Sequence, residues 1–397
     1  RSKTGTDITG VDILNVDVVG QNFSDGNSTG IEILDGTDSQ VANVSNVDIR
    51  DSNVSQFDTG ISVAAPYGGD ISETVIVNNL ITGSTAGIEV STIAADGQSS
   101  GGTIDDLRDN DGSGLTINNN NFVPFGGSGY PDYPVREIGP DGEVDETSVI
   151  DFEILLNDNG FQRAAVARDI GDSEFEATGD FNDESTPKDI DDYENISKTE
   201  IQSFGLRSGV EAGAITASIQ ESIDIANDSS AELVAVDPGE GGYYESLTVT
   251  SNVSIVRTYN SAGTQGRPVI FGRGSGEPVV TITQASSFIS DIVMVAAENK
   301  NGINISGGDF GLRNSIVDVN TSGSGEVYGV DADSASLVDV EGSAIFTGTN
   351  PGNPDTPAKS VQELREDAKE GGIATPTEDQ AVGLQVAADT LDVEETR

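Results

Sequence analysis

Residues 105–114 read Asp-Asp-Leu-Arg-Asp-Asn-Asp-Gly-Ser-Gly, and their oxygen-bearing side chains alternate as the ligands of calcium loops do. Asp109, Asp111 and Ser113 are the residues that would bind Ca²⁺ there. The segment has no acidic residue downstream that would close the coordination sphere as in an EF-hand, so a solvated turn explains the same residues. Calcium is the one cofactor for which the sequence offers candidate ligands.

The residue types that the chain lacks exclude several kinds of catalysis. Its 397 residues include no Cys, no His and no Trp. Without His there is no imidazole base, no Ser-His or Cys-His pair and no His-bound zinc, and without Cys there is no disulfide or thiolate metal site. A glycosidase that uses two carboxylates needs only Asp or Glu, and 68 acidic residues leave it open. No further motif indicates an enzyme.

Nine asparagines lie in Asn-x-Ser/Thr sequences, the acceptor pattern for N-linked glycans. In a chain rich in Asn, Ser and Thr some of these sequences arise by chance, but their frequency is compatible with glycosylation outside the cell. The nine candidates are Asn22, Asn27, Asn43, Asn53, Asn195, Asn227, Asn252, Asn304 and Asn320.

The charge is strongly unbalanced, with 68 Asp and Glu against 19 Lys and Arg and a formal net charge of −49. Self-repulsion of this size would destabilise a compact fold at low salt, whereas molar salt shortens the Debye length to about 3 Å. The composition therefore predicts a protein of a halophilic archaeon. Nucleic acid is not expected as a partner, since phosphate contacts need cations. No apolar run is long enough to span a membrane.

A short phrase of Gly, an aliphatic residue, a variable residue and a second aliphatic residue recurs along the chain. It begins at Gly30, Gly60, Gly87 and Gly114, and again at Gly302, Gly329 and Gly383. The intervals are 30, 27 and 27 residues, then 27 and 54. Alternating aliphatic residues predict a strand, and a constant interval predicts a solenoid, here a parallel β-helix. A β-sandwich is the alternative, but it requires no fixed interval.

Asparagines follow the aliphatic runs at the points where the chain would turn. Asn78 and Asn79 follow Val75-Ile-Val77, and 118–121 is a run of Asn after Leu115-Thr-Ile117. Because Asn tolerates left-handed backbone conformations, we expect these residues to form tight corners between the sheets of the solenoid.

Two segments have helical periodicity. Ile215, Ile219, Ile223 and Ala226 predict a helix over 214–227 that caps a coil stack, and Ser218 with Glu221 has capping-box spacing. A second helix is predicted over 359–371. We therefore divide the chain into coils of a first β-helix (1–169), an acidic linker (170–208), and a cap helix with coils of a second β-helix (209–397).

Three stretches resemble one fold family. Residues 215–256 resemble the opening of right-handed parallel β-helix domains of the pectin-lyase-like superfamily: a capping helix, a strand, a Pro-Gly-x-Tyr-x-Glu type of turn, then a strand. Residues 75–90 resemble the short repeat of the same superfamily, and 157–171 resemble the closing coils of such domains in large secreted haloarchaeal surface proteins. The resemblance implies an all-β, right-handed parallel β-helix (solenoid) in two consecutive stacks.

The same resemblance says little about activity, because this superfamily includes lyases, hydrolases, esterases, adhesins and viral tailspikes. Asp191-Asp192 falls in the acidic linker and lacks the Gly-His-Gly signature of polygalacturonases, and Gly307-Gly-Asp-Phe310 only partly matches an esterase phrase. We expect no catalysis. The function favoured is an extracellular, cell-surface structural glycoprotein: a rigid rod in a filament, surface layer or adhesin. A polysaccharide-active enzyme or its inactive derivative, and a halovirus tail fibre or spike, remain alternatives.

Partners follow from this interpretation. Open ends of a solenoid carry unpaired backbone groups that invite another strand, so we expect identical neighbouring subunits that stack end to end. Cell-surface glycans are a second partner class for an exposed flank. The first residues already resemble a β-coil, which suggests a piece of a longer secreted chain that holds the back of one β-helix and the front of the next.

Overall fold

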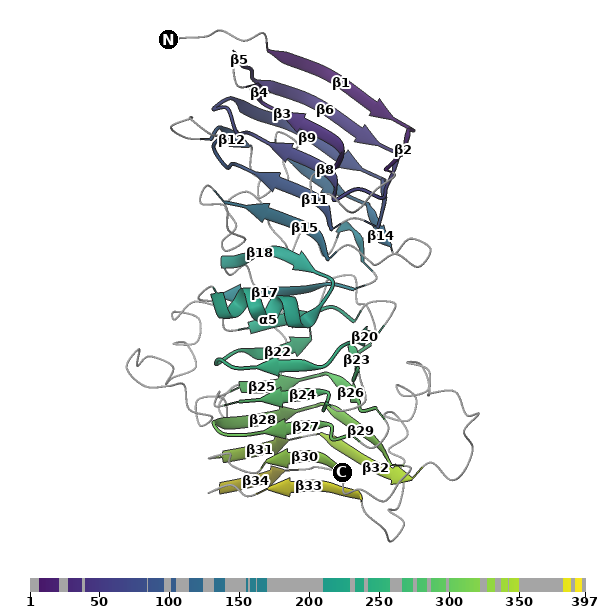
Figure 1. The fold of residues 1–397 in the computed structure, drawn as a ribbon, viewed down its shortest axis with the longest axis vertical. Helices are drawn as coiled ribbons and strands as arrows, with labels where there is room; N and C mark the ends of the chain where they lie inside the picture. Colours follow the sequence, from purple (N-terminus) through teal and green to yellow (C-terminus); the bar gives the residue numbers. More distant parts are fainter. Residues whose placement is uncertain are drawn as a thin grey trace, which may run out of the picture. The chain divides into compact units, whose positions relative to one another are not determined.

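The part of the chain that the structure describes is all-β apart from one helix, and its strands pair almost entirely in parallel (Figure 1). The computed structural model describes residues 7–20, 28–37, 40–83, 85–95, 101–104, 114–123, 132–139, 155, 158–161, 163–169, 210–228, 233–238, 242–257, 266–273, 277–283, 287–297, 300–321, 327–332, 337–341, 343–349, 381–386 and 390–394. The chain forms two compact units, 1–166 with 210–217 (unit 1) and 167–209 with 218–397 (unit 2).

In unit 1 the chain passes through three sheets in rotation. Sheet A contains β1 (Ile8–Leu14), β6 (Val44–Arg50), β9 (Asp70–Val77), β12 (Thr103–Ile104) and β13 (Thr116–Asn118). Sheet B contains β2 (Asp17–Val19), β7 (Asn53–Ser55), β10 (Leu80–Thr82), β14 (Asn121–Val123) and β16 (Gly160–Phe161). Sheet C contains β3 (Thr29–Leu34), β8 (Thr59–Ala64), β11 (Ala86–Ser91), β15 (Tyr133–Ile138) and β18 (Val210–Thr216).

All these neighbours are parallel except β18, which is antiparallel to β15. A short antiparallel pair, β4 (Gly36–Thr37) and β5 (Gln40–Val41), extends from the end of β3. The boundary between the units falls within β17 (Ala165–Asp169).

In unit 2 the helix α5 (Ile219–Asp228) is followed by a rotation of the chain through three parallel sheets. Sheet D contains β19 (Leu233–Val236), β22 (Ser254–Arg257), β25 (Ser287–Ser290), β28 (Asp309–Arg313), β31 (Leu337–Glu341) and β34 (Thr390–Glu394). Sheet E contains β20 (Tyr243–Tyr244), β23 (Val269–Phe271), β26 (Val293–Val295), β29 (Ile316–Thr321) and β32 (Ala344–Thr349). Sheet F contains β21 (Leu247–Val249), β24 (Val280–Ile282), β27 (Ile303–Ile305), β30 (Val327–Ala332) and β33 (Ala381–Val386).

The core of each unit consists of like residues stacked from one strand to the next. In sheet C, Ile31, Ile61 and Ile88 are in register and buried. In sheet B, Phe122 and Phe161 stack with ring centroids 4.9 Å apart and an interplanar angle of 2°. In-register stacking places each side chain against one of the same shape, which favours close packing without voids. Rotation of consecutive strands among stacked parallel sheets is compatible with a β-helix.

The Gly-led phrases at Gly30, Gly60 and Gly87 lie in register in sheet C, and those at Gly302, Gly329 and Gly383 lie in register in sheet F. These parts of the predicted repeat are confirmed. Glycine is required because the next strand approaches so closely: a Cβ on Gly30 would lie 2.6 Å from the carbonyl oxygen of Gly60.

The phrase at Gly114 does not belong to this series. Ile117 pairs with Ile76 of β9 in sheet A, whereas β15 is the strand that follows β11 in sheet C. The interval of 27 residues between Gly87 and Gly114 is therefore a coincidence of sequence. Its physical reason is that the aliphatic alternation, which fixes a strand, does not identify the sheet to which the strand belongs.

The helix predicted over 214–227 is present but begins at Ile219, and residues 214–216 belong to β18 instead. Ile215 pairs with Val135 and is fully buried in the core of unit 1, which accounts for its place in the apolar pattern. The predicted helix at 359–371 and the acidic linker at 170–208 lie outside the described residues. The domain boundaries at 169 and 208 stay predictions.

Candidate functional site

The predicted calcium ligands Asp109, Asp111 and Ser113 lie outside the described residues. Among the residues that the structure does describe, no group of three or more acidic, His or Cys side chains is placed to hold a metal ion. The calcium site therefore stays a prediction from sequence.

The glycosylation candidates differ in accessibility. Asn43, Asn227 and Asn252 are exposed, whereas Asn53 and Asn304 are half-buried within strands. Asn320 belongs to β29, and its side chain is not described. Asn22, Asn27 and Asn195 lie outside the described residues.

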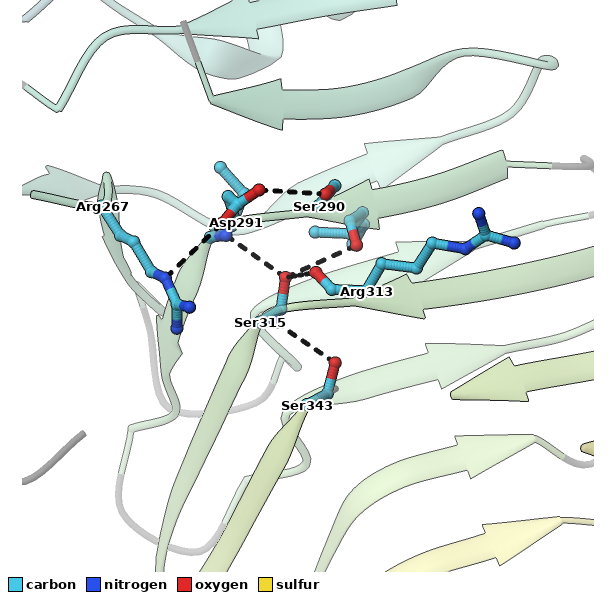
Figure 2. Close-up of polar contacts among 8 residues, drawn as sticks. Arg267, Ser290, Asp291, Arg313, Ser315 and Ser343 are labelled. Atoms are coloured by element: carbon cyan, nitrogen blue, oxygen red, sulfur yellow. Dashed lines mark hydrogen bonds and ion pairs between the residues drawn. The ribbon is translucent and has the colours of Figure 1, made fainter. Parts of the chain in front are cut away.

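A buried polar cluster in unit 2 is the arrangement most like a catalytic site (Figure 2). Asp291 lies at the corner between β25 and β26 and has a left-handed backbone with φ of 59°. Its carboxylate lies 3.8 Å from Nε of Arg267, and the two side chains are 5% and 30% exposed. Ser290 donates a hydrogen bond of 3.4 Å to the same carboxylate. Figure 2 shows the buried side chain of Arg313 extending along its strand, away from Asp291.

The serines of this cluster are engaged in structural hydrogen bonds. Oγ of Ser315 donates to the carbonyl oxygen of Arg313 at 2.8 Å and accepts the backbone N–H of Ile292 at 3.2 Å. Ser343 accepts the backbone N–H of Ser315 at 3.2 Å and donates to Leu312. A nucleophilic serine needs an adjacent base, and the chain has no His to supply it. With a single carboxylate, the cluster also lacks the pair that glycoside hydrolysis requires.

In unit 1 side chains also hydrogen-bond the backbone of neighbouring strands, here as a ladder of asparagines at the corner between sheets A and B. The backbone N–H of Asn79 donates to Oδ1 of Asn120 at 3.0 Å, and the N–H of Asn120 donates to Oδ1 of Asn159 at 2.9 Å. Each amide Nδ2 also donates to a carbonyl of the preceding strand, namely Ile49, Ile76 and Ile117. Ser52 continues the ladder by donating its N–H to Asn79.

In both units, several residues that take part in these ladders follow a residue with a left-handed backbone. In unit 1 these are Asp51, Asn78 and Asn119, with φ of 52°, 60° and 54°. In unit 2 they are Asp291 and Asn314, with φ of 59° and 46°. Asx residues tolerate this conformation at tight turns, so the predicted asparagine corners are confirmed at Asn78 and Asn119. Asp291 is therefore the unit 2 counterpart of these corner residues.

The first turn of α5 is held by a residue distant in sequence. Glu245 accepts hydrogen bonds from the backbone N–H groups of Ile219 (2.8 Å) and Gln220 (3.1 Å) and from the hydroxyl of Ser218 (2.6 Å). Ser218 itself accepts the N–H of Glu221 at 3.4 Å, which is half of the predicted capping box. A carboxylate at the helix N-terminus also interacts favourably with the helix dipole. Glu245 thus joins α5 to the segment between β20 and β21.

Two features escaped the sequence interpretation. Glu245 lies beyond the capping-box spacing, although the sequence places it in the Pro-Gly-x-Tyr-x-Glu type of turn. The exposed Tyr244 stacks on Phe271 with ring centroids 4.8 Å apart, a pair that only the strand register brings together.

Comparisons with protein-family models, with curated proteins and with solved structures find no match to this chain. Within its described part, no helix has the length and apolar character needed to cross a membrane.

Proposed function

We propose that this chain is an extracellular structural glycoprotein of a halophilic archaeon, a rigid rod built from two right-handed parallel β-helices of the pectin-lyase-like kind. The observation that carries the proposal is the use of buried and half-buried polar side chains. Asn79, Asn120 and Asn159 donate and accept hydrogen bonds between successive strands, and Ser315 and Ser343 do the same in unit 2. Buried polar networks whose members are hydrogen-bonded rigidify a fold, which supports a structural role for these side chains.

The net charge of −49 supports a habitat of high salt, where such a surface is screened. It also supports the absence of nucleic acid among the partners.

End-to-end stacking of identical subunits is the proposed mode of assembly. The edge strands β1 and β2 present exposed apolar side chains, with Ile8 45%, Leu14 50% and Val19 56% exposed. Edge strands also carry unpaired backbone groups that can bond another strand. A second copy that adds its own strands beside β1 and β2 would cover the exposed apolar side chains and pair the backbone groups.

Electron microscopy of the purified chain in about 3 M NaCl, at which the Debye length is about 3 Å or less, tests the proposal. We expect rods that associate end to end, and no cleavage of acidic polysaccharide by the same preparation. Leu14→Asp with Val19→Asp should give single short particles. Leu80→Asp is the control, because Leu80 is 37% exposed but lies in β10, at the middle of its sheet. Particles that depolymerise polysaccharide and never associate would overturn the proposal.

A further inference from the structure

Asn43 belongs to an exposed ladder at the start of the sheet A strands. Its backbone N–H donates to a carboxylate oxygen of Asp7 at 3.4 Å, and its own Oδ1 accepts the N–H of Asp70 at 3.1 Å. Asp70 in turn accepts the hydroxyl of Thr103. The oxygen of each Asx side chain is therefore the atom that this ladder uses.

Asp7 and Asp70 occupy the positions equivalent to Asn43 on the neighbouring coils, and Asp has no amide nitrogen. The ladder therefore does not require the Nδ2 atom of Asn43. Nδ2 of Asn43 is exposed with its side chain and has no hydrogen-bond partner among the described residues. The asparagine is held by its oxygen while its nitrogen is available. It is also the start of the acceptor sequence Asn43-Val44-Ser45.

Asn227 has the same arrangement in unit 2. It lies in the last turn of α5, where its exposed side chain accepts the hydroxyl of Ser251 through Oδ1. Across the described part of the chain, its Nδ2 likewise has no hydrogen-bond partner. It begins the sequence Asn227-Asp228-Ser229.

The asparagines of the ladder between sheets A and B give a contrast. Nδ2 of Asn79, Asn120 and Asn159 is committed to the ladder, and the residues two positions later, Ile81, Phe122 and Phe161, are buried core residues. A Ser or Thr there would leave a hydroxyl in the apolar core, so the ladder cannot contain an acceptor sequence.

Two half-buried acceptors are also unsuited. Oδ1 of Asn53 is buried and has no hydrogen-bond partner among the described residues. Packing against the protein, and not a hydrogen bond, therefore holds this side chain. Asn304 also accepts a hydrogen bond through Oδ1, from the amide of Asn301 at 2.7 Å, but unlike Asn43 and Asn227 its side chain is half-buried, in β27 between β24 and β30 of sheet F.

We propose that Asn43 and Asn227 carry N-linked glycans and that Asn53 and Asn304 do not. This rests on the proposed extracellular location, where a lipid-linked glycosyl phosphate is the donor. The bond from Nδ2 to the sugar C1 forms, the bond from C1 to the phosphate oxygen breaks, the lipid phosphate leaves, and Nδ2 loses one proton. The amide oxygen stays an acceptor, so the bonds to Asp70 and Ser251 persist.

Glycopeptide mass spectrometry of the chain secreted by a haloarchaeal host tests this assignment. We expect a glycan mass on the peptides containing Asn43 and Asn227, and bare Asn53 and Asn304. Ser45→Ala should abolish the modification at Asn43 without changing its hydrogen bond to Asp70, and Ser45→Thr should retain it. Asn227→Gln should remove the second glycan.

A bare Asn43 or Asn227, or a glycan on Asn53 or Asn304, would overturn the assignment. The outcome is separable from that of the proposed function. Bare asparagines in a protein that still forms salt-dependent rods would refute the glycan sites alone, whereas failure to associate would refute the scaffold.

Discussion

The side-chain amide of Gln220 bonds both backbone polar groups of Thr248. Its Oε1 accepts the N–H of Thr248 at 2.7 Å, and its Nε2 donates to the carbonyl oxygen of Thr248 at 3.2 Å. Thr248 is the middle residue of β21, which is the edge strand of sheet F. An amide thus takes the position that a neighbouring strand would occupy, and edge strands left open are sites of unwanted pairing.

Replacing Gln220 by Ala should therefore open this edge. Two exposed hydrogen bonds are lost, and since water can replace them we expect a cost of about 1 kcal/mol in the free energy of unfolding. The larger expected effect is association, measured by light scattering at high salt. Asp224→Ala is the control, because Asp224 accepts a hydrogen bond from Nε2 of Gln220 at 2.9 Å and, among the described residues, makes no hydrogen bond to β21. Equal association of both variants would contradict a protective role for Gln220.

The asparagine ladder should be a major source of stability in unit 1. Asn120→Ala removes a buried amide and leaves the N–H of Asn79 and the carbonyl of Ile76 without this partner. Each buried group left unsatisfied costs about 1–3 kcal/mol, so we expect a loss of about 2–5 kcal/mol in unfolding free energy. Chemical denaturation at constant salt measures it.

The matched control for this prediction is the adjacent residue. Asn121→Ala alters an exposed side chain in β14 and should change the unfolding free energy by less than about 0.5 kcal/mol. If the two variants were equally stable, the asparagine ladder would contribute little to the unfolding free energy.

Much of this architecture could be predicted from local patterns. The glycine-led phrases and the asparagine corners are local, because a strand is encoded by alternation and a corner by one left-handed residue. The predictions were wrong where a residue distant in the sequence determines whether a segment is a strand or a helix. Ile215 fits a helical stripe, yet its pairing with Val135 makes it part of a strand.

The polar cluster around Asp291 could not be predicted for the same reason. Arg267 lies 24 residues before Asp291 in the sequence, and only the register of β23 and β26 brings the two segments together. The corner identity of Asp291 can be recognised once Asn314 and Ser315 are seen to follow the same pattern one strand later. Contacts that depend on strand register cannot be predicted from patterns among residues that are adjacent in the sequence.

The stacked glycines should not tolerate a methyl group. In Gly302→Ala the new Cβ would lie 2.2 Å from Cγ1 of Val317 and 2.5 Å from the carbonyl oxygen of Gly329. The backbone carbonyl cannot move without disturbing sheet F, so we expect a loss of about 1–3 kcal/mol or more in unfolding free energy. Gly272→Ala is the comparison, since its nearest neighbour would be Cγ2 of Val279 at 3.2 Å. Thermal melts that rank the two variants in the opposite order would argue against the close approach of β27 and β30.

Salt should control the stability of the whole chain. With a net charge of −49, carboxylates repel one another across the folded surface. The repulsion is largely screened between charges farther apart than the Debye length, which is about 10 Å at 0.1 M and about 3 Å at 1 M salt. We expect the melting temperature followed by circular dichroism to rise steeply between these concentrations and to flatten above them. Sucrose at matched osmolality is the control, because it favours burial without screening charge. A melting temperature that rises equally in sucrose would show that exclusion from the surface, and not charge screening, stabilises the fold.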